Sequence, residues 1–219
     1  MEAPNKGLFA RSRFDELDKQ KLRAEMYREQ HFLCIYCERE IVDGYPAPRI
    51  DHWYPLSDQP ELALHWNNLY LSCTAEQTCD AAKGLSPFRW LDSHVPWPVD
   101  LHYEDAIGFT SRGRAYVRSD VAFCESTRQA LERGLLGAQD GHRVRRQNVN
   151  LNHPALIKAR AAAIHGELKR MENSIDNGTA SADEREEQAT LLLERNARPP
   201  FVSIRVAWLR DTLGIGGQS

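Results

Sequence analysis

Two pairs of cysteines enclose an Asp-His dipeptide within residues 34–84, and this arrangement constrains the fold of the 219-residue chain more than any other feature. Cys34 and Cys37 have two residues between them, as in a zinc knuckle, and Cys73 and Cys79 have five. Four thiolates in two pairs are a usual ligand set of a structural, tetrahedral zinc ion. We therefore predict a zinc site at these four cysteines. The alternative is two unrelated pairs of small buried side chains.

The dipeptide between the pairs, Asp51-His52, suits hydrolytic chemistry. A carboxylate suits Mg²⁺, and a neutral imidazole can take a proton near neutral pH. Adjacent strand residues point to opposite faces, but a twist at a strand end can turn both towards one pocket. Asp80 would supply a second carboxylate, and Asn68 could hold the His52 loop or orient its ring. A cation, a base and fixed positions are what phosphodiester hydrolysis requires.

Two basic residues flank these groups in the sequence. Arg49 precedes the Asp-His dipeptide, and Lys83 follows Asp80 by three residues. Either could contact a scissile phosphate, Arg49 as a planar fork and Lys83 as a point charge. The alternative for each is a salt bridge to a nearby acid.

The stretch resembles the HNH, or ββα-metal, endonucleases. Asp51-His52 is similar to their central Asp-His, Asn68-Leu69 to their Asn-Leu, and Cys79-Asp-Ala-Ala-Lys-Gly84 to their Cys-Asn-x-x-Lys-Gly. Asp80 departs from this pattern, because the family usually has Asn or His there. The resemblance implies a structural zinc ion, a catalytic Mg²⁺ or Mn²⁺ on Asp51 and Asp80, His52 as the base and Asn68 as its support.

Two further segments are similar to the PtuB nucleases, which are partners of PtuA ATPases in Septu and some retron anti-phage systems. They are Glu29-Gln-His-Phe-Leu-Cys-Ile-Tyr-Cys-Glu38 and Asn148-Val-Asn-Leu-Asn-His-Pro154. This similarity implies an antiviral role beside a PtuA-like ATPase. The apolar stripe of the C-terminal helices is the surface we expect that partner to use, unless the same stripe covers the nuclease core.

Charge and hydropathy bear on nucleic-acid binding, on membrane insertion and on the cellular compartment. The net charge is −3, whereas a protein that grips nucleic acid alone is usually basic, so a binding face for DNA or RNA must be local or shared. No apolar run approaches the roughly 20 residues that span a bilayer, and the N-terminus lacks a signal-peptide core. Free thiolates suit a reducing, cytoplasmic setting. The sequence is compatible with a homodimer.

Hydrophobic periodicity and turn residues predict an α+β fold. We expect a zinc-stapled ββα-metal core with an N-terminal helix, a small hairpin and a helical C-terminal third. The expected segments are an N-terminal helical segment (1–30), a nuclease core (31–92), a linker with a hairpin (93–118) and a helical region (119–219). In the first half we expect a helix over 12–30 capped by Ser12, strands at 39–42 and 49–52, and a helix from Cys79. In the second half we expect a hairpin over 106–118 and helices over 120–135, 154–171, 182–196 and 202–213. Asn152 is the expected cap of the helix over 154–171.

A second class of function competes with the nuclease. The net acidity and the helical C-terminal third favour a zinc-stabilised adapter, or binding module, with a relict nuclease pocket. The intact set Asp51, His52, Asn68 and Asp80 favours the enzyme.

Overall fold

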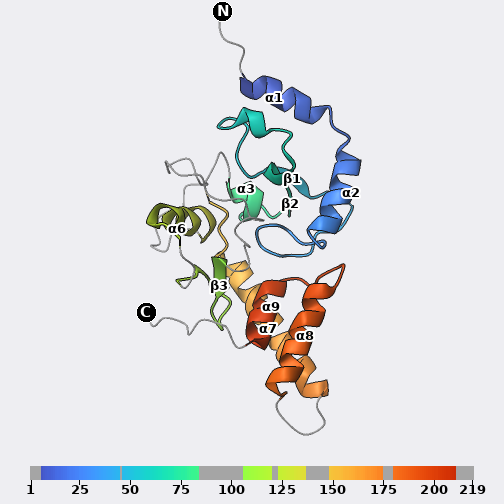
Figure 1. Ribbon diagram of the computed structural model, residues 1–219, viewed down its shortest axis with the longest axis vertical. Helices are drawn as coiled ribbons and strands as arrows, with labels where there is room; N and C mark the ends of the chain where they lie inside the picture. The colour runs from blue at the N-terminus through green and yellow to red at the C-terminus, as the bar shows by residue number, and fades with distance from the viewer. Residues whose placement is uncertain are drawn as a thin grey trace, which may run out of the picture.

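A computed structural model describes residues 6–44, 46–83, 106–119, 123–136, 148–174 and 180–210. The fold is α+β, as predicted, with two small antiparallel sheets among helices (Figure 1). Most of the predicted linker, the start of the predicted helix 120–135 and the end of the predicted helix 202–213 lie outside the described residues.

Two helices, rather than one, form the N-terminal part. They are α1 (Lys6–Asp15) and α2 (Lys19–Glu29). Asp18 separates them, because its carboxylate accepts two backbone N–H groups of the first turn of α2 and so caps that helix. The predicted cap at Ser12 is wrong: Ser12 lies inside α1, where its hydroxyl donates to the carbonyl three residues earlier.

The first sheet pairs β1 (Arg49–His52) with β2 (Leu69–Ser72), and Asp51 lies opposite Tyr70. The predicted strand at 49–52 is therefore confirmed, and its partner was not predicted. The predicted strand at 39–42 is wrong, since only an isolated bridge forms there.

A short helix, α3 (Cys79–Lys83), follows β2 and completes a strand–strand–helix order. Two single 3₁₀ turns, η1 (Pro60–Leu62) and η2 (Trp66–Asn68), lie in the connection between the two strands. This connection returns the chain to β1 and places η2 directly before β2.

The second sheet is the predicted hairpin, made of β3 (Ile107–Phe109) and β4 (Ala115–Val117). Its turn contains Gly113, which has φ +84° and would place a Cβ 2.4 Å from the carbonyl oxygen of Ile157. Only glycine satisfies both conditions, so the hairpin can pack closely on the following long helix. After β4 comes α6 (Glu125–Leu131), which continues as one π-helical turn, η3 (Glu132–Leu136).

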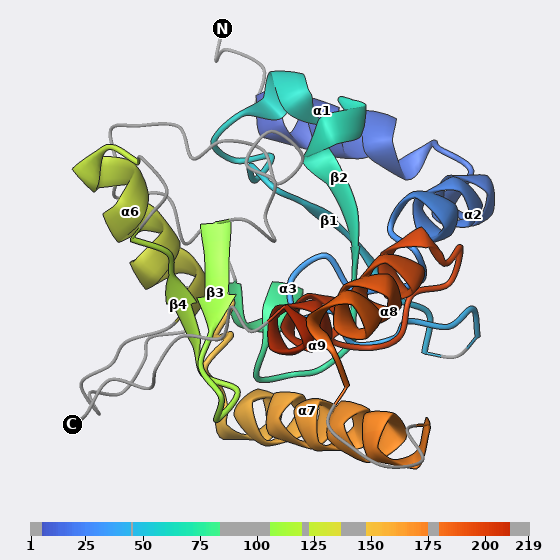
Figure 2. The ribbon, with the colours of Figure 1, turned by 60° about the horizontal axis from the view of Figure 1, so that its bottom comes forward.

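Three helices form the C-terminal part: α7 (Pro154–Ser174), α8 (Ala182–Glu194) and α9 (Val202–Leu209). Proline suits the first position of α7, because its missing N–H would have no intrahelical partner there. Figure 2 shows α9 beside α7, α8 and β3, and it contacts all three. The predicted cap at Asn152 is wrong: its amide exchanges two hydrogen bonds with the backbone of Ala115, and the ring of His153 accepts an N–H of α7 instead.

The apolar stripe of α9 is buried inside this protein. Leu33 of the N-terminal half packs in the same hydrophobic cluster as the helices that carry the stripe. The stripe of α9 therefore packs on the protein's own core. The expectation that a PtuA-like ATPase docks on the C-terminal helices stays a prediction. The buried members of the stripe are Val202, Ile204, Val206 and Leu209.

One main hydrophobic cluster draws on all four predicted segments. It joins Phe14 to Trp53, Ile107 and Ile204. The predicted segment boundaries therefore do not separate independent cores. No helix among the described residues is both long and apolar enough to cross a membrane.

Candidate functional site

Four buried cysteines form a cluster that can hold a metal such as zinc. The Sγ atoms of Cys34, Cys37, Cys73 and Cys79 all lie within 4.8 Å of one another. The Sγ atoms of Cys37 and Cys73 are 3.8 Å apart. Sulfurs around a tetrahedral zinc ion with bonds of about 2.3 Å lie roughly 3.8 Å apart, so the spacing fits. Hydrogen bonds from the three neighbouring cysteine side chains lower the pKa of Cys73, which favours a thiolate.

Backbone and loop contacts support this cluster. The backbone N–H of Cys73 donates to Sγ of Cys34 at 3.3 Å, a bond of the kind that orients a metal ligand. The five-residue gap before Cys79 is not loose, because the carbonyl of Gln77 accepts one hydrogen bond from the Asn150 side chain and the Gln77 side chain pairs with the ring of His153. Asn150 and His153 therefore fix the loop between Cys73 and Cys79.

Asp51 of β1 lies in a nearly buried ionic network beside the cysteines. Its carboxylate is 11% exposed and accepts from Nζ of Lys83 at 2.6 Å, while the Lys83 side chain is 1% exposed. The Tyr36 hydroxyl donates to the same oxygen, Oδ2. Lys83 also donates to the Tyr36 hydroxyl at 3.0 Å and to the backbone carbonyl of His52. Tyr36 did not figure among the predicted site residues.

The three hydrogens of the Lys83 ammonium group thus have three acceptors. This arrangement matches the salt-bridge alternative for Lys83. The predicted contact of Lys83 with a phosphate is not available while the amine is buried and fully bonded.

Asp80, in the first turn of α3, is the second carboxylate of the site. It pairs with Arg49 at 3.3 Å, and Arg49 remains half exposed. Burial, followed by the repulsion of the neighbouring Asp51 carboxylate, raises the pKa of Asp80 to about 6. β1 and α3 therefore bring the two predicted carboxylates together, with one exposed arginine at their edge.

The imidazole of His52 has different neighbours from the Asp51 carboxylate. Its Nε2 lies 3.0 Å from the carbonyl oxygen of Ala63, and the ring of Phe14 from α1 packs edge-on at 4.6 Å between centroids. Because a carbonyl only accepts, Nε2 carries the hydrogen and Nδ1 keeps its lone pair. Burial lowers the pKa of His52, so the ring is neutral near pH 7.

His52 does not join the two carboxylates in a compact ligand group. In the part of the chain that the structure describes, the four cysteines are the one group of three or more metal-ligating side chains within such short distances. The expected twist that would turn Asp51 and His52 into a single pocket is therefore not seen.

Asn68 is completely buried and supports the chain around His52. Its Oδ1 accepts from the backbone N–H of Tyr54 at 2.7 Å, and its Nδ2 donates to the carbonyls of Tyr54 and Leu62. These bonds hold the loop after β1, and they do not reach the imidazole. Of the two predicted roles, Asn68 has the first, which is to hold the loop.

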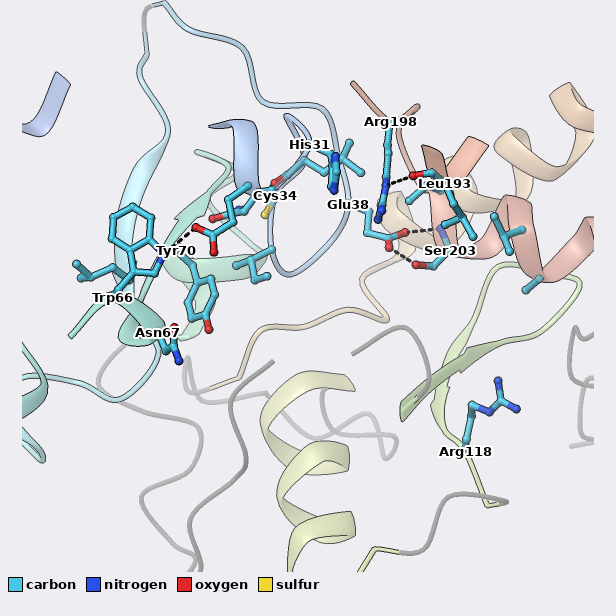
Figure 3. A pocket seen from close by; sticks show the side chains of 18 of the residues that line it. His31, Cys34, Glu38, Trp66, Asn67, Tyr70, Arg118, Leu193, Arg198 and Ser203 are labelled. Carbon is cyan, nitrogen blue, oxygen red and sulfur yellow. Dashed lines mark hydrogen bonds between the residues drawn. The ribbon is translucent and has the colours of Figure 1, made fainter. Parts of the chain in front are cut away.

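A cavity of about 560 Å³ lies away from the two carboxylates, between helices α8 and α9 and the segment that carries Cys34 and Cys37, which we call the cysteine knuckle. Figure 3 shows Trp66, Asn67 and Tyr70 on one side and Arg198, Glu38 and Ser203 on the other. Of the predicted site residues only Cys34 lines it. This cavity is therefore separate from the carboxylate cluster.

No protein-family model matches the chain, and no curated protein is significantly similar to it.

Proposed function

We propose that the chain is a metal-dependent nuclease of the ββα-metal type, with zinc on its four cysteines and a catalytic Mg²⁺ or Mn²⁺ on Asp51 and Asp80. The observation that supports this most is the pair of adjacent carboxylates, one on β1 and one on α3. Burial and then the like charge of Asp51 raise the pKa of Asp80, and a divalent cation bound to both carboxylates would remove that repulsion. Oxygen ligands are what these cations prefer.

Each residue then has a defined task. A divalent cation would neutralise charge on the scissile phosphate and stabilise the leaving oxygen. Asp51 and Asp80 would hold this cation through their carboxylate oxygens, and Arg49 offers an exposed guanidinium to the nucleic-acid backbone. In this proposal His52 is the base: its Nδ1, whose tautomer the bond from Nε2 to Ala63 fixes, would accept a proton from the attacking water. This role requires the imidazole to approach the carboxylates, because the three side chains do not form one compact group in the structure. The substrate is DNA or RNA.

The burial of the His52 imidazole favours the second candidate, a zinc-stabilised adapter with a relict pocket. The imidazole is 8% exposed, and Phe14 of α1 lies against it. Cleavage requires that α1 gives water access to Nδ1, whereas an adapter requires no such access. The partner we propose for either form is a PtuA-like ATPase, in an anti-phage complex; this rests on the sequence resemblance alone.

A cleavage assay separates the two candidates. The zinc-loaded full chain is incubated with plasmid DNA and with RNA in Mg²⁺, in Mn²⁺ and in EDTA, alone and with a co-expressed PtuA-like ATPase. The nuclease predicts metal-dependent cleavage that is lost in Asp51→Asn and in His52→Gln. Glutamine keeps an N–H donor for Ala63, so this variant should stay folded and zinc-loaded.

The matched control is His65→Gln, since His65 is exposed and lies outside the carboxylate cluster. It should cleave as the unmodified protein does. Cleavage by His52→Gln at the rate of this control would refute the assigned base. An absence of cleavage under every condition, with the ATPase bound, would favour the adapter.

A further inference from the structure

The buried hydroxyl of Tyr36 connects the cysteine cluster to the carboxylate pair. Tyr36 lies between Cys34 and Cys37 and is 2% exposed. Its ring stacks on Trp53 with centroids 5.9 Å apart and planes at 16°, and Trp53 is completely buried. Two metal ligands and one stacked ring thus leave the Tyr36 side chain little freedom to move.

The Tyr36 hydroxyl accepts a hydrogen bond from Lys83 and donates one to Asp51. Nζ of Lys83 donates to the Tyr36 oxygen at 3.0 Å, so the Tyr36 hydrogen is available to Asp51. Lys83 donates to the same Asp51 oxygen at 2.6 Å. Both bonds therefore end on Oδ2 of Asp51, and neither Lys83 nor Tyr36 bonds to Oδ1.

We propose that Tyr36 is a positioning residue of the catalytic cation site: it holds Oδ2 of Asp51, which would leave Oδ1 to bind the cation. The inference rests on the proposed function, because it assigns Asp51 as a cation ligand. Tyr36 itself touches neither the cation nor the substrate. A carboxylate that is fixed through one oxygen offers the other in a single orientation, and such outer hydrogen bonds commonly tune metal affinity.

The position of Tyr36 gives the cysteine cluster a second task. Whatever fixes Cys34 and Cys37 also fixes the ring between them, and the ring fixes the carboxylate. The cysteine knuckle then supports the cation site as well as stabilising the fold.

A purely structural role for Tyr36 would leave the cation site unchanged when the hydroxyl is removed. Tyr27→Phe is the matched control, because Tyr27 is also a buried tyrosine of the main cluster and its hydroxyl has no hydrogen-bond partner among the described residues. Both substitutions delete one oxygen and keep the ring.

The experiment measures Mn²⁺ binding to the zinc-loaded full chain by electron paramagnetic resonance, for the unmodified protein, Asp51→Asn, Tyr36→Phe and Tyr27→Phe. We expect Asp51→Asn to abolish binding and Tyr36→Phe to weaken it by about 10–100-fold, the usual effect of losing an outer-shell bond. Tyr27→Phe should bind as the unmodified protein does. Near-ultraviolet circular dichroism and zinc content establish that each variant is folded.

A second measurement avoids the substitution at Tyr36. In the unmodified protein labelled with 3-fluorotyrosine, the ¹⁹F resonance of Tyr36 should shift as Mg²⁺ is added, and that of Tyr27 should not. Equal Mn²⁺ affinity of Tyr36→Phe and Tyr27→Phe, or no shift at Tyr36 under saturating Mg²⁺, would overturn the positioning role and leave the nuclease proposal intact. No Mn²⁺ binding by the unmodified protein would instead overturn the proposed cation site, and this inference with it.

Discussion

The substitution Lys83→Met tests the ionic network most directly. It keeps the length of the side chain and removes the ammonium group, which is 1% exposed and bonds to Asp51, Tyr36 and the His52 carbonyl. Asp51 then keeps its charge at 11% exposure with no cation beside it. Breaking a buried ion pair by removing one partner costs about 3–5 kcal/mol.

The expected loss is large enough to measure in a melting experiment. For a chain of this size about 1 kcal/mol shifts Tm by roughly 2–4 °C, so Lys83→Met should lower Tm by roughly 6–20 °C. Differential scanning calorimetry on zinc-loaded protein gives this value. The exposed Lys158→Met on α7 is the control, and a surface change of this kind should alter stability by less than about 0.5 kcal/mol.

A double mutant isolates the pair itself. Asp51→Asn with Lys83→Met removes both charges, so the double mutant should lose less stability than the sum of the two single losses, by about 1–3 kcal/mol. A Tm of Lys83→Met equal to that of the Lys158 control would refute the buried ion pair. Strict additivity of the two single changes would refute it as well.

Three further outcomes follow from other parts of the molecule. Burial and a neighbouring carboxylate raise the pKa of Asp80 to about 6, so the native metal-free protein binds the Asp80 proton more tightly than the unfolded chain does. The stability that this proton contributes is complete below about pH 4 and is lost as the pH rises through about 6. Urea unfolding across this range should show the loss, and Asp80→Asn should remove it. Cys34→Ser should lower zinc content and stability together, since structural zinc supplies on the order of 10 kcal/mol to a small site, and the exposed Cys124→Ser should change neither by atomic absorption and melting. Glu38→Ala should cost about 1 kcal/mol by urea unfolding, because the Glu38 carboxylate accepts the N–H and the hydroxyl of a residue in the first turn of α9; a loss no greater than that of the exposed Glu40→Ala would contradict this.

Local sequence signals predicted much of this fold. Pro154 opens α7, a turn with Gly113 joins the hairpin strands, and the strand at 49–52 forms where expected. The four cysteines come together as their pairing predicted. In each of these cases residues a few positions apart, or ligands of one common type, carry the signal.

Non-local contacts explain what the sequence did not reveal. All four residues of β2 are buried, so the run shows no alternation that would mark a strand. Tyr36, Asp51 and Lys83 are separated by 15 and 32 positions along the chain, and no local pattern predicts their hydrogen bonds. The N-terminal helix was misjudged because Asp18 competes with Ser12 as a cap, and only the observed bonds decide between them.

The bond from Glu38 to the start of α9 has a consequence for how the protein is made. Glu38 follows the last cysteine of the first pair, whereas α9 begins at Val202, much later in synthesis. Leu33, next to the sulfur ligand Cys34, stays uncovered until that helix leaves the ribosome. A nascent chain should therefore complete the contacts of Glu38 and Leu33 only after α9 has been synthesised, because the bond from Ser203 to Glu38 spans 165 positions.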